Sequence, residues 1–235
     1  MIIGIISAMS KEHQQLTSLL SHTTHETDGP CTFTTGQLGN NTLVLLQSGM
    51  GKVNAAVGCT TLLRHYKPDC VLSTGCAGGV DSRLSVMDVV VGRQTCYHDV
   101  VLDEGFEVGQ IQGLPPRFDG DSSLLRTAMS LASSATTASE ALPTLHEGLI
   151  CTGDQFITSP DQLAAIKKNF PDALAVDMES NAIAQTCYLH STPFLSFRTI
   201  SDIPGSEAHL EQYQDFWGTM ADRSFVATRA FISAL

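Results

Sequence analysis

Short apolar segments rich in Val, Ile, Leu and Phe recur along the chain and alternate with segments of helical character. We expect the apolar segments to form strands at residues 2–6, 42–47, 70–73, 86–91, 148–151, 173–176 and 194–200. The predicted helices cover residues 11–20, 53–65, 124–132, 160–169, 180–190 and 214–235. Because near-continuous apolar strands alternating with helices are typical of a mostly parallel sheet covered on both faces, the pattern predicts an α/β fold.

No repeat or linker divides the chain. It has 235 residues, of which 43% are hydrophobic, which is an ordinary length and composition for a single α/β domain. The stretch 130–139 is rich in Ser, Thr and Ala, and we interpret it as a helix end followed by a loop. We therefore expect one domain over residues 1–235.

The charge balance is strongly acidic, with 13 Lys and Arg against 24 Asp and Glu and a formal net charge of −11. Because cationic contacts to phosphate dominate nucleic-acid affinity, this balance argues against a nucleic-acid binder, and equally against an anionic membrane surface. The chain has no apolar stretch of the roughly 18–20 residues that span a bilayer. It also has no basic leader at its start, so we expect no signal peptide. The expected partner is a neutral or cationic small molecule.

The seven cysteines are odd in number, widely spaced and without a Cys-x-x-Cys pair. This pattern does not predict a disulfide scaffold or a zinc site, and it favours a reducing cytoplasm. Cys76 has no nearby His-containing motif to supply a base, so we do not expect a thiol nucleophile.

Two glycine-containing motifs follow predicted strands. Residues 48–52 read SGMGK, but Asn54 stands where a dinucleotide fingerprint needs its third Gly, and the spacing before Lys52 is wrong for a P-loop. The motif is either a turn that approaches a ligand closely or a tight turn without one. Residues 73–79 read STGCAGG, and we expect a loop that offers backbone N–H groups and room for a flat ligand.

Three acids lie where predicted strands give way to helices. Glu12 follows the first strand, with Ser10 as the expected N-cap, and it either serves a site or only complements the helix dipole. Asp177 and Glu179 lie in the segment AVDMES, residues 175–180. Open α/β sheets bind ligands at such carboxyl ends of strands, although acids there also cap helices.

The segment FLSFRTISD, residues 194–202, places Arg198 and Asp202 at the same parity of a strand. An Arg in an apolar strand must be paired, and Glu12 or Glu179 is the expected partner, in a site or in a purely structural ion pair. Three carboxylates at separate strand exits, those of Glu12, Glu179 and Asp202, lie together with Arg198 in this pattern. The combination points to glycosidic-bond chemistry. That reaction needs one acid for the leaving group and another group to activate water.

Five blocks of sequence together identify a family. They are IGIISAMSKE, SGMGKVNAA, STGCAGG, TGDQFI, and AVDMESNAIA with FRTISD. Over residues 1 to about 216 the chain resembles the 5'-methylthioadenosine/S-adenosylhomocysteine nucleosidases of the purine nucleoside phosphorylase superfamily. The resemblance implies a single three-layer α/β/α domain with a mixed central sheet flanked by helices. It also implies a homodimer and no metal or organic cofactor.

The resemblance implies roles for the charged residues. Glu12 matches the general base that activates the attacking water, with Arg198 beside it. Asp202 matches the acid that protonates N7 of the departing adenine, and Glu179 matches the carboxylate that binds the ribose 2'- and 3'-hydroxyls. Asp177 keeps a structural or capping role. Further substrate contacts are implied for Ala8, Met9, Met50, Cys76, Ala77, Gly78, Phe156, Ile157, Met178, Ser201 and Tyr213.

The chain departs from the family pattern at several positions. Cys76 stands where relatives usually carry Ser, at a position that helps hold the nucleophilic water, and a thiol is a weaker hydrogen-bond partner. Asp177 replaces the usual Glu. Tyr213, with Phe216 as the alternative, is expected to cover the 5'-thio group, and Leu102 is expected to close the pocket of the neighbouring subunit.

The implied activity is hydrolysis of 5'-methylthioadenosine and S-adenosylhomocysteine, with 5'-deoxyadenosine as a further substrate. It would release adenine and a 5-thioribose product for methionine salvage and the methyl cycle. The alternatives are, in order, an aminofutalosine nucleosidase, a purine nucleoside phosphorylase and a catalytically weakened nucleoside-binding protein. No basic phosphate clamp precedes Gly75, since the nearest upstream Arg is Arg64, and this favours water over phosphate as the nucleophile.

Overall fold

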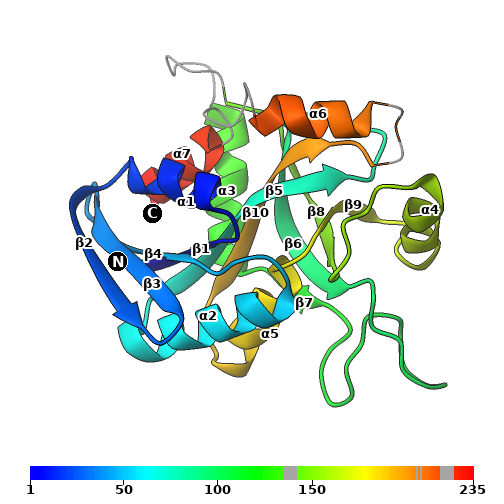
Figure 1. Ribbon diagram of the computed structural model, residues 1–235, viewed down its shortest axis with the longest axis horizontal. Coiled ribbons are helices and arrows are strands. Elements are labelled where there is room, and N and C mark those ends of the chain that lie inside the picture. Colours follow the sequence, from blue (N-terminus) through cyan, green and yellow to red (C-terminus); the bar gives the residue numbers. More distant parts are fainter. Residues whose placement is uncertain (135–141, 205, 207, 218–224) are drawn as a thin grey trace.

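The computed structural model describes residues 1–134, 142–204, 206, 208–217 and 225–235 (Figure 1). One mixed sheet organises the fold. Its strands in chain order are β1 (Ile2–Ser7), β2 (Ser21–Asp28), β3 (Cys31–Leu38), β4 (Asn41–Gln47), β5 (Cys70–Gly79), β6 (Val89–Tyr97), β7 (Phe118–Asp119), β8 (Leu145–Thr152), β9 (Ala173–Asp177) and β10 (Phe194–Asp202). The helices are α1 (Ser10–Thr17), α2 (Lys52–Tyr66), α3 (Ser122–Ser134), α4 (Pro160–Asn169), α5 (Ser180–Leu189), α6 (His209–Asp215) and α7 (Val226–Ala234).

Part of the sheet closes on itself. β10 pairs with β6, β6 with β8, β8 with β9 and β9 with β5, and β5 pairs back with β10. β4, β3 and β2 extend from this ring through β1, which pairs in parallel with both β5 and β4, and β7 pairs with β6 of the ring. Because strands of a closed ring end around the same openings, loops far apart in the sequence meet at one opening.

Helices cover both faces of the sheet. Figure 1 shows α2 and α5 together on one side and α1, α3 and α7 on the other. Cys59, Leu62 and Ile183 belong to the apolar core beneath α2 and α5, and Leu124 and Phe231 belong to the core beneath α3 and α7. These two layers confirm the predicted α/β fold with a mixed central sheet flanked by helices.

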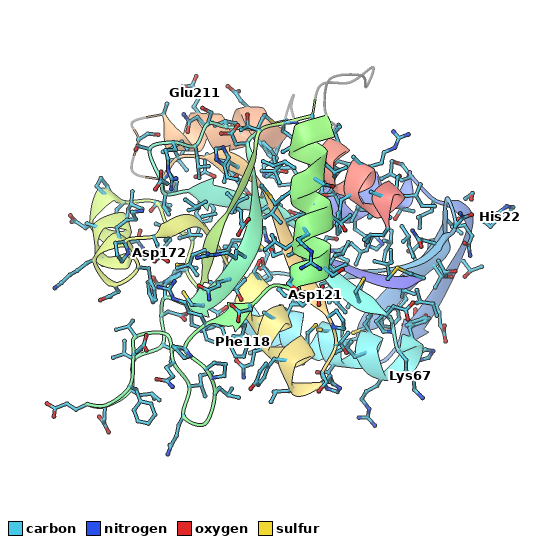
Figure 2. The ribbon with its side chains drawn as sticks, turned by 180° about the vertical axis from the view of Figure 1, so that it is seen from behind. His22, Lys67, Phe118, Asp121, Asp172 and Glu211 are labelled. Carbon is cyan, nitrogen blue, oxygen red and sulfur yellow. The ribbon has the colours of Figure 1, made fainter. Side chains whose placement is uncertain are left out.

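The view from behind in Figure 2 shows α3 crossing the molecule, with Asp121 at its start. Asp121 Oδ1 accepts the N–H groups of Ser123 at 2.9 Å and Leu124 at 3.0 Å, which satisfies donors left free at a helix N-terminus. In the described part of the chain, no helix is long and apolar enough to cross a membrane.

Two local predictions are wrong, and one pair of strands was not predicted. The antiparallel pair β2–β3 was not expected, because β2 reads SHTTHETD and is exposed along its whole length, without an apolar pattern. Residues 73–79 continue strand β5 instead of forming a loop. The expected helix at 214–235 is replaced by two shorter helices, α6 and α7, and residues 218–224 of that prediction lie outside the described residues.

Candidate active site

A cavity that is partly open to solvent lies where the ends of several strands meet. It is bounded by the exits of β1, β8 and β9, by the last residues of β5 and β10, by the loop after β4 and by α6, which Figure 1 shows above β5 and β10. It is lined by Ala8, Met9, Glu12, Met50, Cys76, Ala77, Gly78, Gln155, Phe156, Ile157, Val176, Asp177, Met178, Glu179, Arg198, Ser201, Asp202, Pro204 and Tyr213. The structure thus brings every residue predicted to contact substrate within one chain into a single cavity.

Glu12 is buried at the start of α1, where backbone groups hold its carboxylate. Oε2 accepts the N–H groups of Ala8 at 3.0 Å and Met9 at 2.9 Å, and Oε1 accepts the N–H of Cys76 at 3.1 Å. The helix N-cap is Met9, not the expected Ser10, which is the first residue of the helix. Burial raises the pKa of Glu12, although these N–H groups and Arg198 oppose the rise. A buried carboxylate of raised proton affinity has the properties of a general base.

Arg198 lies wholly inside the protein and forms an ion pair with Asp177, with 2.8 Å between Nε and Oδ2. Nε also donates to Ser180 Oγ at 3.0 Å, and Nη2 donates to Ser73 Oγ at 2.6 Å. The prediction that Glu12 or Glu179 would be its ion-pair partner is therefore wrong. Asp177 lies at the end of β9, where its carboxylate meets the Nε edge of the guanidinium.

Asp177 combines this ion pair with a capping function. Its Oδ1 accepts the hydroxyl of Thr152 at 2.6 Å, and its Oδ2 accepts the N–H of Ser180 at 3.1 Å, at the start of α5. Gly75 allows Arg198 and Glu12 to come together, because a Cβ added there would lie 2.6 Å from Arg198 Nη1 and 2.7 Å from Glu12 Oε1.

Glu179 is buried beside the same guanidinium. Its Oε1 accepts the N–H of Gly51 at 2.8 Å, and Gly51 has φ +93°, a backbone conformation that favours glycine. Burial raises the pKa of Glu179 to about 7, with Arg198 opposing the rise and Asp177 adding to it. The SGMGK motif therefore supports a carboxylate at the cavity.

Asp202 is buried at the end of β10, where the pairing with β5 shifts register after Ile200. The Ser201 hydroxyl lies 2.6 Å from Asp202 Oδ1 and 3.3 Å from the carbonyl oxygen of Ala77. The shift lets consecutive residues, Ser201 and Asp202, both line the cavity.

Aromatic side chains stand at the outer part of the cavity. Phe156 is 49% exposed, and its ring lies edge-on to Tyr213 with 5.5 Å between the centroids. Tyr213 lines the cavity, whereas Phe216 is 1% exposed and does not line it. Of the two candidate aromatic residues, Tyr213 is therefore the one that borders the cavity.

The family model described as "Phosphorylase superfamily" matches residues 2–233. A 5'-methylthioadenosine/S-adenosylhomocysteine nucleosidase of Bacillus thuringiensis (strain Al Hakam) is 41% identical over 218 residues, which cover 92% of each chain. The chain belongs to the methylthioadenosine/S-adenosylhomocysteine nucleosidase family.

Solved structures of this nucleosidase family are closely similar. The enzyme of Neisseria meningitidis in complex with methylthio-immucillin-A superposes with a TM-score of 0.92 at 35% identity, covering 100% of this chain and 99% of that one. The enzyme of Colwellia psychrerythraea 34H in complex with adenine has a TM-score of 0.92 at 36% identity, covering 100% and 96%. The resemblance read from the five sequence blocks is confirmed at the level of family and fold.

The sequence analysis did not predict three of the residues that line the cavity, and it did not place a fourth, Asp177, at the cavity. Gln155 and Val176 lie within the recognised segments TGDQFI and AVDMES, and Pro204 follows FRTISD by two residues, so their place in or near these motifs was the available signal. Asp177 was assigned a structural role, which its contacts bear out, but it also borders the cavity. Leu102, the residue expected from the neighbouring subunit in this nucleosidase family, is 43% exposed and lies outside the cavity of its own chain.

Proposed function

We propose that the protein hydrolyses the N-glycosidic bond of 5'-methylthioadenosine and S-adenosylhomocysteine, and of 5'-deoxyadenosine as a further substrate. The products are adenine and the corresponding 5-substituted ribose, 5-thioribose for the first two substrates. The observation that carries this proposal is the convergence of Glu12, Glu179 and Asp202 in one cavity around Arg198. The names of the relatives, and the adenine and methylthio-immucillin-A bound in two of the similar structures, support it.

The proposed reaction divides the work among three acids. Glu12 takes a proton from a water molecule that attacks the anomeric carbon. Asp202 donates a proton to N7, so that adenine leaves as a neutral base. Glu179 accepts hydrogen bonds from the 2'- and 3'-hydroxyls and stabilises the positive charge that develops on the sugar. Well-placed proton transfers of this kind contribute typically ~10²–10⁴ each to the rate.

The remaining proposed contacts are those that the family resemblance assigns to residues lining the cavity. Phe156 stacks on the purine, and the backbone of Ile157 contacts its edge. Met178 lies against the sugar, and Tyr213 covers the 5' substituent. The other lining residues assigned to the substrate are Ala8, Met9, Met50, Cys76, Ala77, Gly78 and Ser201.

The charge of the cavity favours water over phosphate as the nucleophile. Among the described residues that line the cavity, Arg198 is the one Lys or Arg, and it is already paired with Asp177. Glu12, Glu179 and Asp202 add further negative charge. An attacking phosphate dianion would therefore meet repulsion from this described lining, which offers it no unpaired cation.

Cys76 gives this chain a local difference at the attacking water. Burial raises the pKa of its thiol well above the ordinary value, and the nearby Glu12 carboxylate adds to the rise. The thiol is therefore neutral and acts as a weak hydrogen-bond partner, so Glu12, Arg198 and the backbone are left to orient the water.

We further propose a cytoplasmic homodimer with no metal or organic cofactor. Val101, Leu102 and Phe106 are exposed apolar side chains on the segment after β6, which Figure 1 shows extending from the body of the molecule. Such a patch fits a subunit contact that completes the partner's pocket. Free thiols at all seven cysteines fit a reducing compartment.

The purified protein incubated with 5'-methylthioadenosine is expected to release free adenine without added phosphate. Tight binding without adenine release would leave a nucleoside-binding protein, and strict phosphate dependence would indicate a phosphorylase. Parallel assays with S-adenosylhomocysteine and aminofutalosine rank the substrates.

Asp202→Asn removes the proposed proton donor while keeping the shape of the side chain. We expect turnover to fall by about 10²-fold or more, with substrate binding largely retained. Measurement of kcat and of the dissociation constant separates the two effects. Near-normal turnover would remove Asp202 from the acid role.

A further inference from the structure

Three loops around the cavity meet at Lys52, the first residue of α2. Nζ of Lys52 donates to both carboxylate oxygens of Asp99, at 2.9 and 2.8 Å, and lies 3.8 Å from Asp154 Oδ2. The backbone N–H of Lys52 donates to Asp154 Oδ1 at 2.8 Å, and the N–H of Asp154 donates to Asp99 Oδ2 at 2.9 Å. Lys52 follows β4, Asp99 follows β6 and Asp154 follows β8, so this cluster fastens three strand exits together.

The surroundings hold the ammonium group in place. Nζ of Lys52 lies 5.2 Å from the centre of the Tyr97 ring, within the range of a cation–π contact. Burial opposes ionisation of Asp99, but the hydrogen bonds from Lys52 and from the Asp154 N–H hold its pKa below the ordinary value. The side chains of Lys52 and Asp99 are only 23% and 14% exposed. This ion pair is therefore better shielded from water than a surface pair, which usually contributes little.

The cluster is joined directly to Glu179. Gly51, whose N–H holds Glu179 Oε1 at 2.8 Å, immediately precedes Lys52. Asp154 packs against Gly51 so closely that a Cβ there would lie 3.0 Å from Asp154 Oδ1. Gly49 and Gly51 both have positive φ and no side chain to fix the turn, so the clamp formed by Lys52, Asp99 and Asp154 is what holds the Gly51 N–H from the cluster side.

We propose that Lys52 and Asp99 are positioning residues that fix the Gly51 N–H and thereby aim the Glu179 carboxylate at the sugar hydroxyls. This inference rests on the proposed nucleosidase function, in which Glu179 binds those hydroxyls. Neither residue lines the cavity, so both act through Gly51. A misplaced hydrogen-bonding group near a reacting sugar lowers the rate even when the group itself is unchanged.

A substrate lacking one of those hydroxyls separates positioning from general damage. The variants Asp99→Asn and Lys52→Met are assayed with 5'-methylthioadenosine and with its 3'-deoxy analogue. We expect kcat/KM to fall about tenfold or more for the parent substrate, and less than about threefold for the analogue, which cannot use the full Glu179 contact. Lys52→Arg keeps the cation and is expected to recover most of the loss.

Asp172→Asn is the matched control, because it removes a carboxylate from another ion pair, with 2.6 Å between Arg117 Nη1 and Asp172 Oδ2. Asp172, labelled in Figure 2, precedes the amino end of β9 and does not line the cavity. We expect this variant to leave kcat/KM unchanged on both substrates. A control that lost activity on the parent substrate alone would overturn the assignment to the clamp.

Equal losses on the two substrates for the clamp variants would show a structural role only, and no loss would show that the clamp does not act on Glu179. Circular dichroism and thermal melting establish that each variant is folded, and Lys52→Arg provides the mildest change if Lys52→Met unfolds.

If the unmodified protein released no adenine, the proposed function would fail on its own. The clamp would then be tested by the binding of adenosine and 3'-deoxyadenosine, for which the same selective loss of affinity is expected.

Discussion

Replacing Glu179 by Gln removes a buried group whose ionisation opposes folding, while keeping an oxygen that can accept the Gly51 N–H. In the folded protein, burial raises the pKa of Glu179 from its ordinary value of 4.5 to about 7. The folded state therefore binds this proton more tightly than the unfolded state. The stabilisation from the proton is complete below pH 4.5 and is lost as the pH rises to about 7.

The size of the effect follows from the same pKa difference. At about 1.4 kcal/mol for each pKa unit, the rise from 4.5 to about 7 corresponds to about 3 kcal/mol once Glu179 is ionised. Glu179→Gln does not incur this loss. We expect its free energy of unfolding, relative to the unmodified protein, to increase by about 2–3 kcal/mol between pH 5 and pH 8.

Urea unfolding at pH 5, 6, 7 and 8 measures this difference, with one protein concentration throughout because subunit association also stabilises a protein. Glu147→Gln, the same substitution at an exposed side chain, is the control for the loss of one carboxylate. A difference between Glu179→Gln and the unmodified protein that stays constant with pH, or decreases as the pH rises, would refute the reasoning. The variant is expected to lose activity at every pH, since the proposed contact with the sugar hydroxyls is weakened.

Two further substitutions test other parts of the site. Arg198→Met leaves Asp177 buried without its cation and is expected to lower the free energy of unfolding by about 3–5 kcal/mol; urea unfolding measures it, and a loss below about 1 kcal/mol would contradict the buried ion pair. Cys76→Ser supplies a stronger hydrogen-bonding group beside Glu12 and is expected to raise kcat severalfold with KM within about twofold. Steady-state kinetics measure both constants, and an unchanged kcat would mean that Cys76 does not affect the water.

Local signals predicted the regular elements well. Helix α4 begins at Pro160 and ends at Asn169 as predicted, because Pro is favoured at the first helical position and Ser159 and Gln162 cap the start with each other's side chains. The buried strands β1 and β10 were recognised from continuous apolar residues. Such features depend on neighbours in the sequence and therefore leave a readable pattern.

Features that depend on tertiary contacts were missed. The sequence predicts a loop at residues 73–79 because glycine is unfavourable in strands, but β5 pairs with β10 over residues 71–78 and with β9 at Gly78 and Gly79. Its glycines make room for close neighbours, since a Cβ on Gly78 would lie 2.6 Å from Pro204 and one on Gly79 would lie 2.9 Å from Ile203. Strand β2 gave no apolar pattern, because its hydrogen bonds to β3, not burial, hold it in place.

The site residues were predictable as a set, but the partner of Arg198 was not. Several acids follow strands that end at the same opening, and the choice among them depends on the registers that β9 and β10 each take against β5 and on side-chain conformations. The sequence indicates that a carboxylate must pair with a buried Arg, and the structure alone assigns it to Asp177.

This assignment matters for the proposed reaction because the direct ion pair of Arg198 is with an acid that takes no part in it. The ion pair and Ser73 occupy Nε and Nη2 of Arg198, whereas Glu12 is held by three backbone N–H groups and Glu179 by one. A direct ion pair would lower the pKa of Glu12 and make it too weak a base to take a proton from water. With the main ion pair assigned to Asp177, burial dominates and raises the pKa of Glu12. Asp177, which takes no part in the proposed reaction, thus balances the positive charge of the guanidinium. Glu12 keeps the proton affinity that the proposed base requires.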